Sequence, residues 1–240
     1  MQPRFPRMPL HLLQPLSTGP VPIPGLVGYS GLHMADELLI FEQTIEALFL
    51  RALAGRLKPD CKARLRQAGL DVDQKLKPAY SFQSWMTFLR IAADELYAGM
   101  PLEEGAFKLG ELYIEGFRET MLGRAVLSLL RVLGPRRALA RATQSFRAGN
   151  NYTESRLTEL GPAQFELWMN EVGSLPSFTA GIIHAGLRVA GAQNIRVEPT
   201  GHDGHGCTYR ISWKEASVSS VVVGSGDSKA SKRAGSINSL

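Results

Sequence analysis

The chain has 240 residues, of which 44% are hydrophobic and 20% charged, and a formal net charge of +5. That length suits one large domain with extra segments at its ends, and the ordinary apolar fraction excludes a wholly disordered or collagen-like chain. The two cysteines, Cys61 and Cys207, are too few for a disulfide framework, and no uninterrupted apolar stretch is long enough to span a membrane. We therefore expect a cytoplasmic protein without a membrane span.

Both ends of the chain have compositions that disfavour folding. Residues 1–33 hold seven of the fourteen prolines and no acidic residue, and residues 214–240 are rich in serine and glycine. We expect a disordered proline-rich extension over 1–33, a single domain over 34–213 and a disordered tail over 214–240. The stretch from Met34 resembles a natural start, which leaves Met1 and Met34 both open as the first residue. A secretory signal is disfavoured, because proline and histidine interrupt MPLHLLQPL.

The first part of the domain shows the three- and four-residue spacing of helices. The expected helices span residues 40–57, 59–65, 82–99, 101–120, 125–133 and 135–147. Residues 77–81 are expected to form a loop, with Ser81 as the N-cap of the helix that follows. Gly123 is expected to separate two helices, and Gly134 with Pro135 to break the chain before the last.

The period changes after Asn151, where apolar and polar residues alternate as they do in strands. The expected strands lie near 153–160, 164–171, 194–198 and 207–213, with a helix over 177–190 between the second and third. A run of helices followed by closely spaced strands indicates an α+β fold, with N-terminal helices packed on a C-terminal four-stranded antiparallel sheet. Cys207, Tyr209, Ile211 and Trp213 are expected to share one buried face.

Metal and haem sites are considered and disfavoured. His202, His205 and Cys207 have ligand chemistry in HDGHGC, but the same segment reads as a hairpin turn, and a structural zinc usually needs four ligands. Whether these three residues bind metal stays open. His184 is the only histidine in an expected helix, where a packed or partly exposed side chain is favoured over an axial haem ligand. We therefore expect no cofactor.

Catalytic motifs are also missing from the sequence: it contains no G-x-S-x-G, Walker loop, G-x-G-x-x-G or H-E-x-x-H. No catalytic residue is assigned, and an enzyme is disfavoured. Five apolar side chains are candidates for the lining of a ligand pocket between the helices and the sheet, although core packing alone explains them. They are Trp85, Phe88, Phe107, Ile114 and Phe117.

Arginine is concentrated in one stretch. Residues 121–150 contain six arginines and no acidic residue. Arg136, Arg137 and Arg141 follow Pro135 at an expected helix start, which makes them candidate anion ligands. The plainer interpretation is that they pair with carboxylates from another segment, and Glu154 or Glu159 is the expected source.

The segments FEQTIEALFLRAL, LRQAGLDVDQKLKPAYSFQSW, LGELYIEGFRETMLGRAV and LGPRRALARATQSFRAGNNY, with the closing C-x-Y-x-I-x-W, carry a family resemblance. Together they resemble an uncharacterised paralogous family expanded in myxobacteria, a domain of unknown function without an established activity. The end of the chain is also similar, more distantly, to the fold group of 4-vinyl reductase, haem–nitric-oxide-binding and Golgi-transport adaptor domains. That similarity implies helices packed on an antiparallel sheet.

These observations favour a non-enzymatic regulatory or adaptor domain that binds a protein partner or a small apolar ligand. The alternative is an arginine-mediated module that binds anions or nucleic acid, although nucleic acid is disfavoured because no aromatic residue interleaves the arginines before Phe146. A homodimer is left open.

Overall fold

The computed structural model describes residues 37–170, 173–203 and 206–214, and these residues belong almost entirely to a compact unit that begins at Leu38. The expected segment 1–33 lies outside the described residues, as does the expected tail 214–240 except for Lys214, which ends strand β6. The elements in chain order are β1 (Leu39–Phe41), α1 (Glu42–Ile45), the π-helix η1 (Glu46–Ala52), α2 (Pro59–Gln67), β2 (Ala79–Ser81), α3 (Phe82–Leu96), α4 (Leu102–Phe117), α5 (Met121–Ala140), α6 (Ala142–Arg147), β3 (Ser155–Gly161), β4 (Gln164–Asn170), α7 (Pro176–Val189), β5 (Gln193–His202) and β6 (Gly206–Lys214). None of the described helices is both long and apolar enough to cross a membrane.

The predicted four-stranded antiparallel sheet is confirmed, with strand order β3-β4-β6-β5. Phe165 on β4 lies opposite Ile211 on β6, and Leu167 lies opposite Tyr209. All four side chains are buried on one face, as the alternation predicted. Cys207 is buried on the same face and Trp213 is half-buried, stacked on Phe165 with ring centroids 5.0 Å apart.

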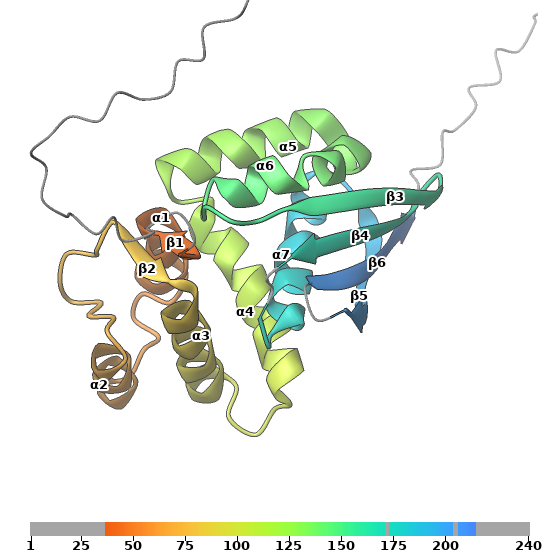
Figure 1. Cartoon of the computed structure of the whole chain (residues 1–240). Coiled ribbons are helices and arrows are strands. Elements are labelled where there is room, and N and C mark those ends of the chain that lie inside the picture. The colour runs from red at the N-terminus through yellow and green to blue at the C-terminus, as the bar shows by residue number, and fades with distance from the viewer. Residues whose placement is uncertain (1–36, 171–172, 204–205, 215–240) are drawn as a thin grey trace, which may run out of the picture. The chain divides into compact units, whose positions relative to one another are not determined.

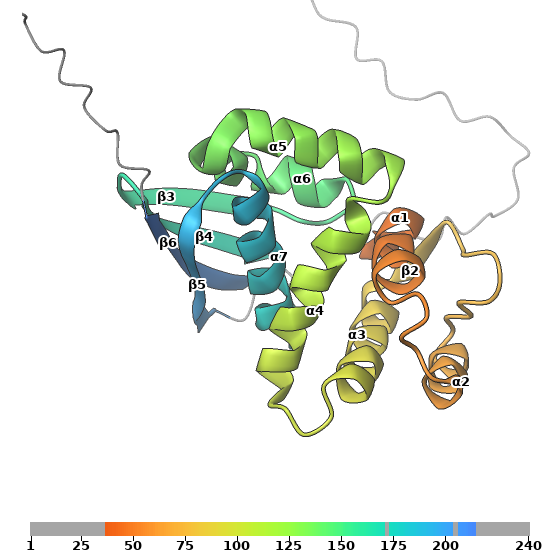
Figure 2. The same ribbon diagram turned by 180° about the vertical axis from the view of Figure 1, so that it is seen from behind.

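Helices cover the buried face of this sheet in successive layers. Helix α7 packs against the sheet, α4 lies on the other side of α7, and α3 and η1 lie beyond α4 (Figures 1 and 2). Helices α4 and α7 approach closely because a glycine of each faces the backbone of the other. A Cβ on Gly110 would lie 2.1 Å from the Phe178 carbonyl oxygen, and one on Gly181 would lie 2.1 Å from that of Phe107.

The expected helix over 40–57 is wrong at both ends. Residues 39–41 form strand β1, which pairs antiparallel with β2, so the expected loop over 77–81 is partly a strand. The helix that follows becomes a π-helix from Glu46 to Ala52, and Leu53 N–H donates to the carbonyl of Leu48, five residues back, at 2.9 Å. Ser81 does cap α3, since its Oγ accepts from Ser84 N–H at 3.2 Å.

Helix α5 runs above the sheet and bends at Gly134 (Figure 1). Gly134 has φ 75° and ψ 170°, a left-handed conformation that favours glycine, and Pro135 follows it, so the expected break at this point is confirmed. The expected boundary at Gly123 is wrong. The helix already begins at Met121, because the Thr120 hydroxyl caps it by accepting from Gly123 N–H at 2.9 Å.

Candidate functional site

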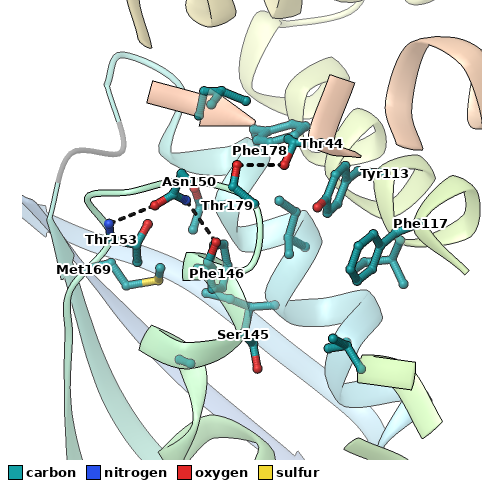
Figure 3. A pocket seen from close by; sticks show the side chains of 18 of the residues that line it. Thr44, Tyr113, Phe117, Ser145, Phe146, Asn150, Thr153, Met169, Phe178 and Thr179 are labelled. Atoms are coloured by element: carbon teal, nitrogen blue, oxygen red, sulfur yellow. Dashed lines mark hydrogen bonds between the residues drawn. The ribbon is translucent and has the colours of Figure 1, made fainter. Parts of the chain in front are cut away.

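A cavity of about 130 Å³ lies where the helical layers meet α5, α6 and the sheet. Figure 3 shows that the side chains around the cavity come from segments far apart in the sequence, among them Thr44, Tyr113, Phe146 and Phe178. Among the described residues, the lining includes seven aromatic side chains and no charged one. The aromatic side chains are Phe82, Trp85, Tyr113, Phe117, Phe146, Tyr152 and Phe178.

The aromatic rings of the lining hold one another in place. Trp85 meets Phe178 edge to face at 5.6 Å between ring centroids, and Tyr113 stacks on Phe117 at 5.6 Å. Phe82 and Tyr152 form a further edge-to-face pair at 5.4 Å. Such pairs fix ring orientation, so the cavity has a defined apolar wall.

The turn over 148–151 forms the polar end of the cavity and is tied to the first strand and helix. Gln43 Nε2 donates to the Ala148 carbonyl at 2.7 Å, and the Thr44 hydroxyl donates to the Gly149 carbonyl at 2.9 Å. Asn151 Oδ1 accepts from the backbone N–H of Leu39 at 2.9 Å. These bonds place the turn against β1 and α1, more than a hundred residues earlier in the chain.

Asn150 fixes the shape of this turn from within. Its Oδ1 accepts from the backbone N–H groups of Tyr152 and Thr153, at 3.1 and 2.9 Å, while its Nδ2 donates to the Phe146 carbonyl at 3.1 Å (Figure 3). An asparagine that bonds to the backbone two and three residues on is the usual core of a tight turn.

Tyr113 is the most deeply buried ionisable group of the lining. Its phenol lies near Thr44, whose own hydroxyl donates to the Gly149 carbonyl at 2.9 Å. Burial raises the pKa of Tyr113 to about 12, because a phenolate would be poorly solvated there. Tyr113 is therefore a neutral hydrogen-bond donor at physiological pH, and not a base.

The structure brings three of the five aromatic and aliphatic candidates together. Trp85, Ile114 and Phe117 line the cavity. Phe88 instead packs in the helical core, edge to face with Phe49 and Tyr80, and Phe107 lies against His184 with ring centroids 5.5 Å apart. The polar lining residues Thr44, Tyr113 and Asn150 were missed, since only the tertiary fold brings them to one place.

The arginine candidates do not converge on one point. Arg136 Nη2 lies 2.6 Å from Glu159 Oε2, which confirms the expectation that a carboxylate from the following segment meets these arginines. Arg147 lies 3.4 Å from Glu154 in the same manner. Arg137 and Arg141 are exposed and form no ion pair within the residues that the structure describes.

Candidate metal and haem ligands lie away from the cavity. His202 and Cys207 are paired across β5 and β6, His205 lies outside the described residues, and the described residues hold no cluster of three or more metal-ligating side chains. His184 Nδ1 lies 3.0 Å from Glu111 Oε1, on the α4–α7 side. Burial raises the pKa of the Cys61 and Cys207 thiols, which makes both poor nucleophiles.

Residues 38–214 match the family described as "Protein of unknown function (DUF2378)". No curated protein sequence matches the chain. The fold is similar to that of the Fe(II) unliganded H-NOX protein from K. algicida, with 13% identity, a TM-score of 0.53, and coverage of 72% of this chain and 96% of that one. It is also similar to an H-NOX protein from S. oneidensis in the Fe(II)NO ligation state, with 12% identity, a TM-score of 0.50, and coverage of 72% and 99%. At such identities the likeness concerns the fold alone.

Haem does not fit the cavity that the structure describes. Haem iron is held in proteins by histidine, by a cysteine thiolate, by methionine together with histidine, or by tyrosine. The described lining residues include no histidine or cysteine, and burial raises the pKa of Tyr113 to about 12, which opposes the ionisation that binding iron would require. The volume of about 130 Å³ is also below the 300–1,000 Å³ of typical drug-sized pockets, and a porphyrin is larger than most such ligands. The cavity therefore suits a much smaller guest.

Proposed function

The chain belongs to the DUF2378 family of proteins of unknown function, and on that premise we propose that its domain is a non-enzymatic module that binds a small, neutral, apolar ligand in the cavity. The observation that carries this proposal is an aromatic-walled cavity of about 130 Å³ whose described lining holds no charged side chain. Apolar pockets with a few polar groups are the usual form of small-molecule sites.

Two asparagines at the polar end of the cavity favour an apolar guest, because their side-chain hydrogen bonds are already made inside the protein. Asn150 makes three such bonds. Asn170 accepts from Glu154 N–H at 2.6 Å and donates to the Tyr152 carbonyl at 3.0 Å. A guest would have to break these bonds to form its own, so polar ligands gain little.

The size of the cavity narrows the ligand class to small ring compounds. An apolar cavity of about 150 Å³ engineered into another protein stays dry and takes up benzene. A space of about 130 Å³ with aromatic walls accepts a single ring in the same way.

The same lining argues against catalysis. In the described part of the chain, no lining side chain titrates near neutral pH, and no thiol or acid–base pair faces the cavity. A site of this kind binds without transforming its guest. The domain then acts through a change in stability or shape when the ligand is present, which is a regulatory role.

Binding of benzene and indole to the purified full chain tests the proposal. We expect benzene to raise the melting temperature and to show saturable binding by calorimetry, because a ligand that binds only the folded state stabilises it by mass action. The phenol analogue is expected to bind more weakly, because its hydroxyl must leave water and the two asparagines at the polar end already make their hydrogen bonds. Retention of haem by the purified protein in native mass spectrometry would contradict the proposal.

Two variants separate binding in the cavity from binding elsewhere. Ala142→Leu adds volume at the lining and is expected to abolish the benzene-induced shift. Leu130→Ala enlarges the same space and is expected to admit indole more tightly. Leu109→Ala removes a buried leucine that does not line the cavity, and it should lower stability by a similar amount, about 2–5 kcal/mol, without changing the ligand response. An unchanged benzene shift in Ala142→Leu would overturn the assignment.

A further inference from the structure

The outer face of the first half of α5 exposes apolar side chains that a folded surface usually covers. Met121 and Val132 are 81% and 83% exposed, and Leu129 and Leu122 are 43% and 37% exposed. Met121, Ala125, Leu129 and Val132 follow one another at helical spacings of three and four, so they form one stripe along the helix. Gly123, Leu127 and Leu130, on the opposite side, are buried. We call this stripe, together with the exposed arginines beside it, the outer face of α5.

Arginines run beside this apolar stripe. Arg124 and Arg131 are exposed and lie seven residues, or two turns, apart, so they fall along one side of this stripe. Arg124 donates to the backbone carbonyl of Glu119 at 3.0 Å, and within the described residues neither arginine forms an ion pair with a carboxylate. Residues 121–150 contain neither an acidic residue nor a lysine. The outer face of α5 therefore combines exposed apolar side chains with a positive charge that comes from arginine alone.

We infer that the outer face of α5 is the docking surface for a protein partner that presents an acidic amphipathic helix. Glutamate or aspartate along one edge of such a helix would meet Arg124 and Arg131, whose planar guanidinium groups pair with carboxylates in bidentate geometry. Its apolar edge would cover Met121, Leu129 and Val132. Arginine and methionine are enriched in protein–protein interfaces, while lysine is depleted, which matches this face.

Other occupants fit the charge and composition less well. A second copy of the chain packed face to face would place arginines against arginines, with no acid in residues 121–150 to offset them. Residues 1–33 contain no acid, and residues 215–240 contain three basic and two acidic residues, so neither end of the chain supplies the opposite charge. Helices that lie on anionic membranes typically carry a strongly charged polar face rich in lysine and arginine, whereas Arg124 and Arg131 are the only charged residues of 121–133.

A defined peptide tests this inference in the full chain. The probe is a fluorescent synthetic helix with leucine along one face and glutamate along its edge, measured by anisotropy against a scrambled peptide of the same composition. We expect saturable binding that weakens as salt rises. Arg124→Glu with Arg131→Glu is expected to reduce affinity at least about tenfold. Met121→Ser with Val132→Ser should reduce it as well. Arg56→Glu with Arg196→Glu changes the net charge equally at exposed arginines elsewhere and should leave binding unchanged.

Each contrary outcome points to a different occupant and overturns the inference. Equal loss of binding in the Arg56/Arg196 variant would mean that net charge, and not this face, holds the peptide. Co-sedimentation with phosphatidylserine vesicles that is lost in the Arg124/Arg131 variant, without peptide binding, would identify a membrane surface. A dimer in light scattering that dissociates in the Met121/Val132 variant would identify a second copy. Equal binding of the scrambled peptide would show that no helical face is recognised.

Discussion

Arg136 forms an ion pair between helix α5 and strand β3. It lies at the start of the second half of α5, where a positive side chain beside the positive end of a helix dipole needs a negative neighbour, and Glu159 of β3 supplies it at 2.6 Å. Both side chains are well exposed, at 66% and 41%. Water and salt therefore screen the attraction, and the pair contributes little to the free energy of unfolding.

We predict that Arg136→Ala lowers the free energy of unfolding by no more than about 1 kcal/mol in urea denaturation. Arg137→Ala is the matched control, since Arg137 is exposed and has no ion-pair partner among the described residues, and it should have a smaller effect. The difference between the two variants should shrink in high salt. A loss of several kcal/mol in Arg136→Ala would mean that the pair is buried when the protein folds in solution.

Tyr113 links stability to alkaline pH. Its pKa is raised to about 12 in the folded protein, while the phenol of an unfolded chain titrates near 10. Above pH 10 the unfolded state loses this proton first, so the contribution of Tyr113 to stability is complete below pH 10 and is lost as pH rises toward 12. The loss is about 2–3 kcal/mol for two pKa units.

We predict that the free energy of unfolding of the parent falls between pH 10 and 12, and that Tyr113→Phe removes part of this fall. Burial also raises the pKa of Tyr209, which remains in the variant, so some pH dependence persists. Urea denaturation across this range measures both slopes. Identical slopes for the parent and Tyr113→Phe would show that Tyr113 is not buried as described.

The close packing of α4 against α7 depends on glycine at the contact between the two helices. A Cβ at Gly181 would lie 2.1 Å from the Phe107 carbonyl oxygen, so Gly181→Ala must push the helices apart. We predict a loss of about 1–3 kcal/mol. Gly186→Ala, one and a half turns later in α7, meets nothing within 4 Å and should gain up to about 1 kcal/mol from helix propensity. Thermal melts that rank these two variants in the opposite order would contradict the packing.

The elements that could be predicted from sequence are those whose signal is local. The alternation over 164–170 and 207–213 gave the two central strands nearly to the residue, because one face of each is buried and the other is not. Strand β1 could not be predicted in the same way. Its three residues continue the apolar pattern of the helix after them, and only their pairing with β2, forty residues later, makes them extended.

At the scale of the whole molecule, the described residues form two buried clusters, one among the helices and one against the sheet, and the cavity is lined by residues of both. The cavity touches α3 and α4 on one side and β4 and α7 on the other, so its wall belongs to both. The sequence shows that some of the lining residues are apolar. It does not predict the cavity, because a cavity depends on how side chains from distant segments pack together. Thr44 and Asn150 lie 106 positions apart and meet only when the chain folds.

Helix α7 contributes side chains to both clusters, which predicts that damage to the sheet unfolds the helices too. Ile211 is fully buried in the central strand β6, and Ile211→Asp places a carboxylate there without a partner. The cost is comparable with the roughly 5–15 kcal/mol that stabilises a typical domain, so we predict loss of both helical circular dichroism and the buried tryptophan fluorescence signal. Arg210→Gln, on the opposite face of the same strand, should melt near the parent. Helical signal that survives in Ile211→Asp would mean that the helices fold independently.

Helix α5 contributes to both the cavity and the outer face: Leu127 and Leu130 line the cavity, and Arg124 and Arg131 are exposed on the outside. A guest that shifts the inner side of this helix moves the outer side with it, because a helix is a rigid rod only about 10 Å across. Thermodynamic reciprocity then applies: whatever factor a guest imposes on the partner's affinity, the partner imposes on the guest's. Because the backbone at Gly134 leaves the helical conformation, a shift of the first half of α5 need not carry the second half with it.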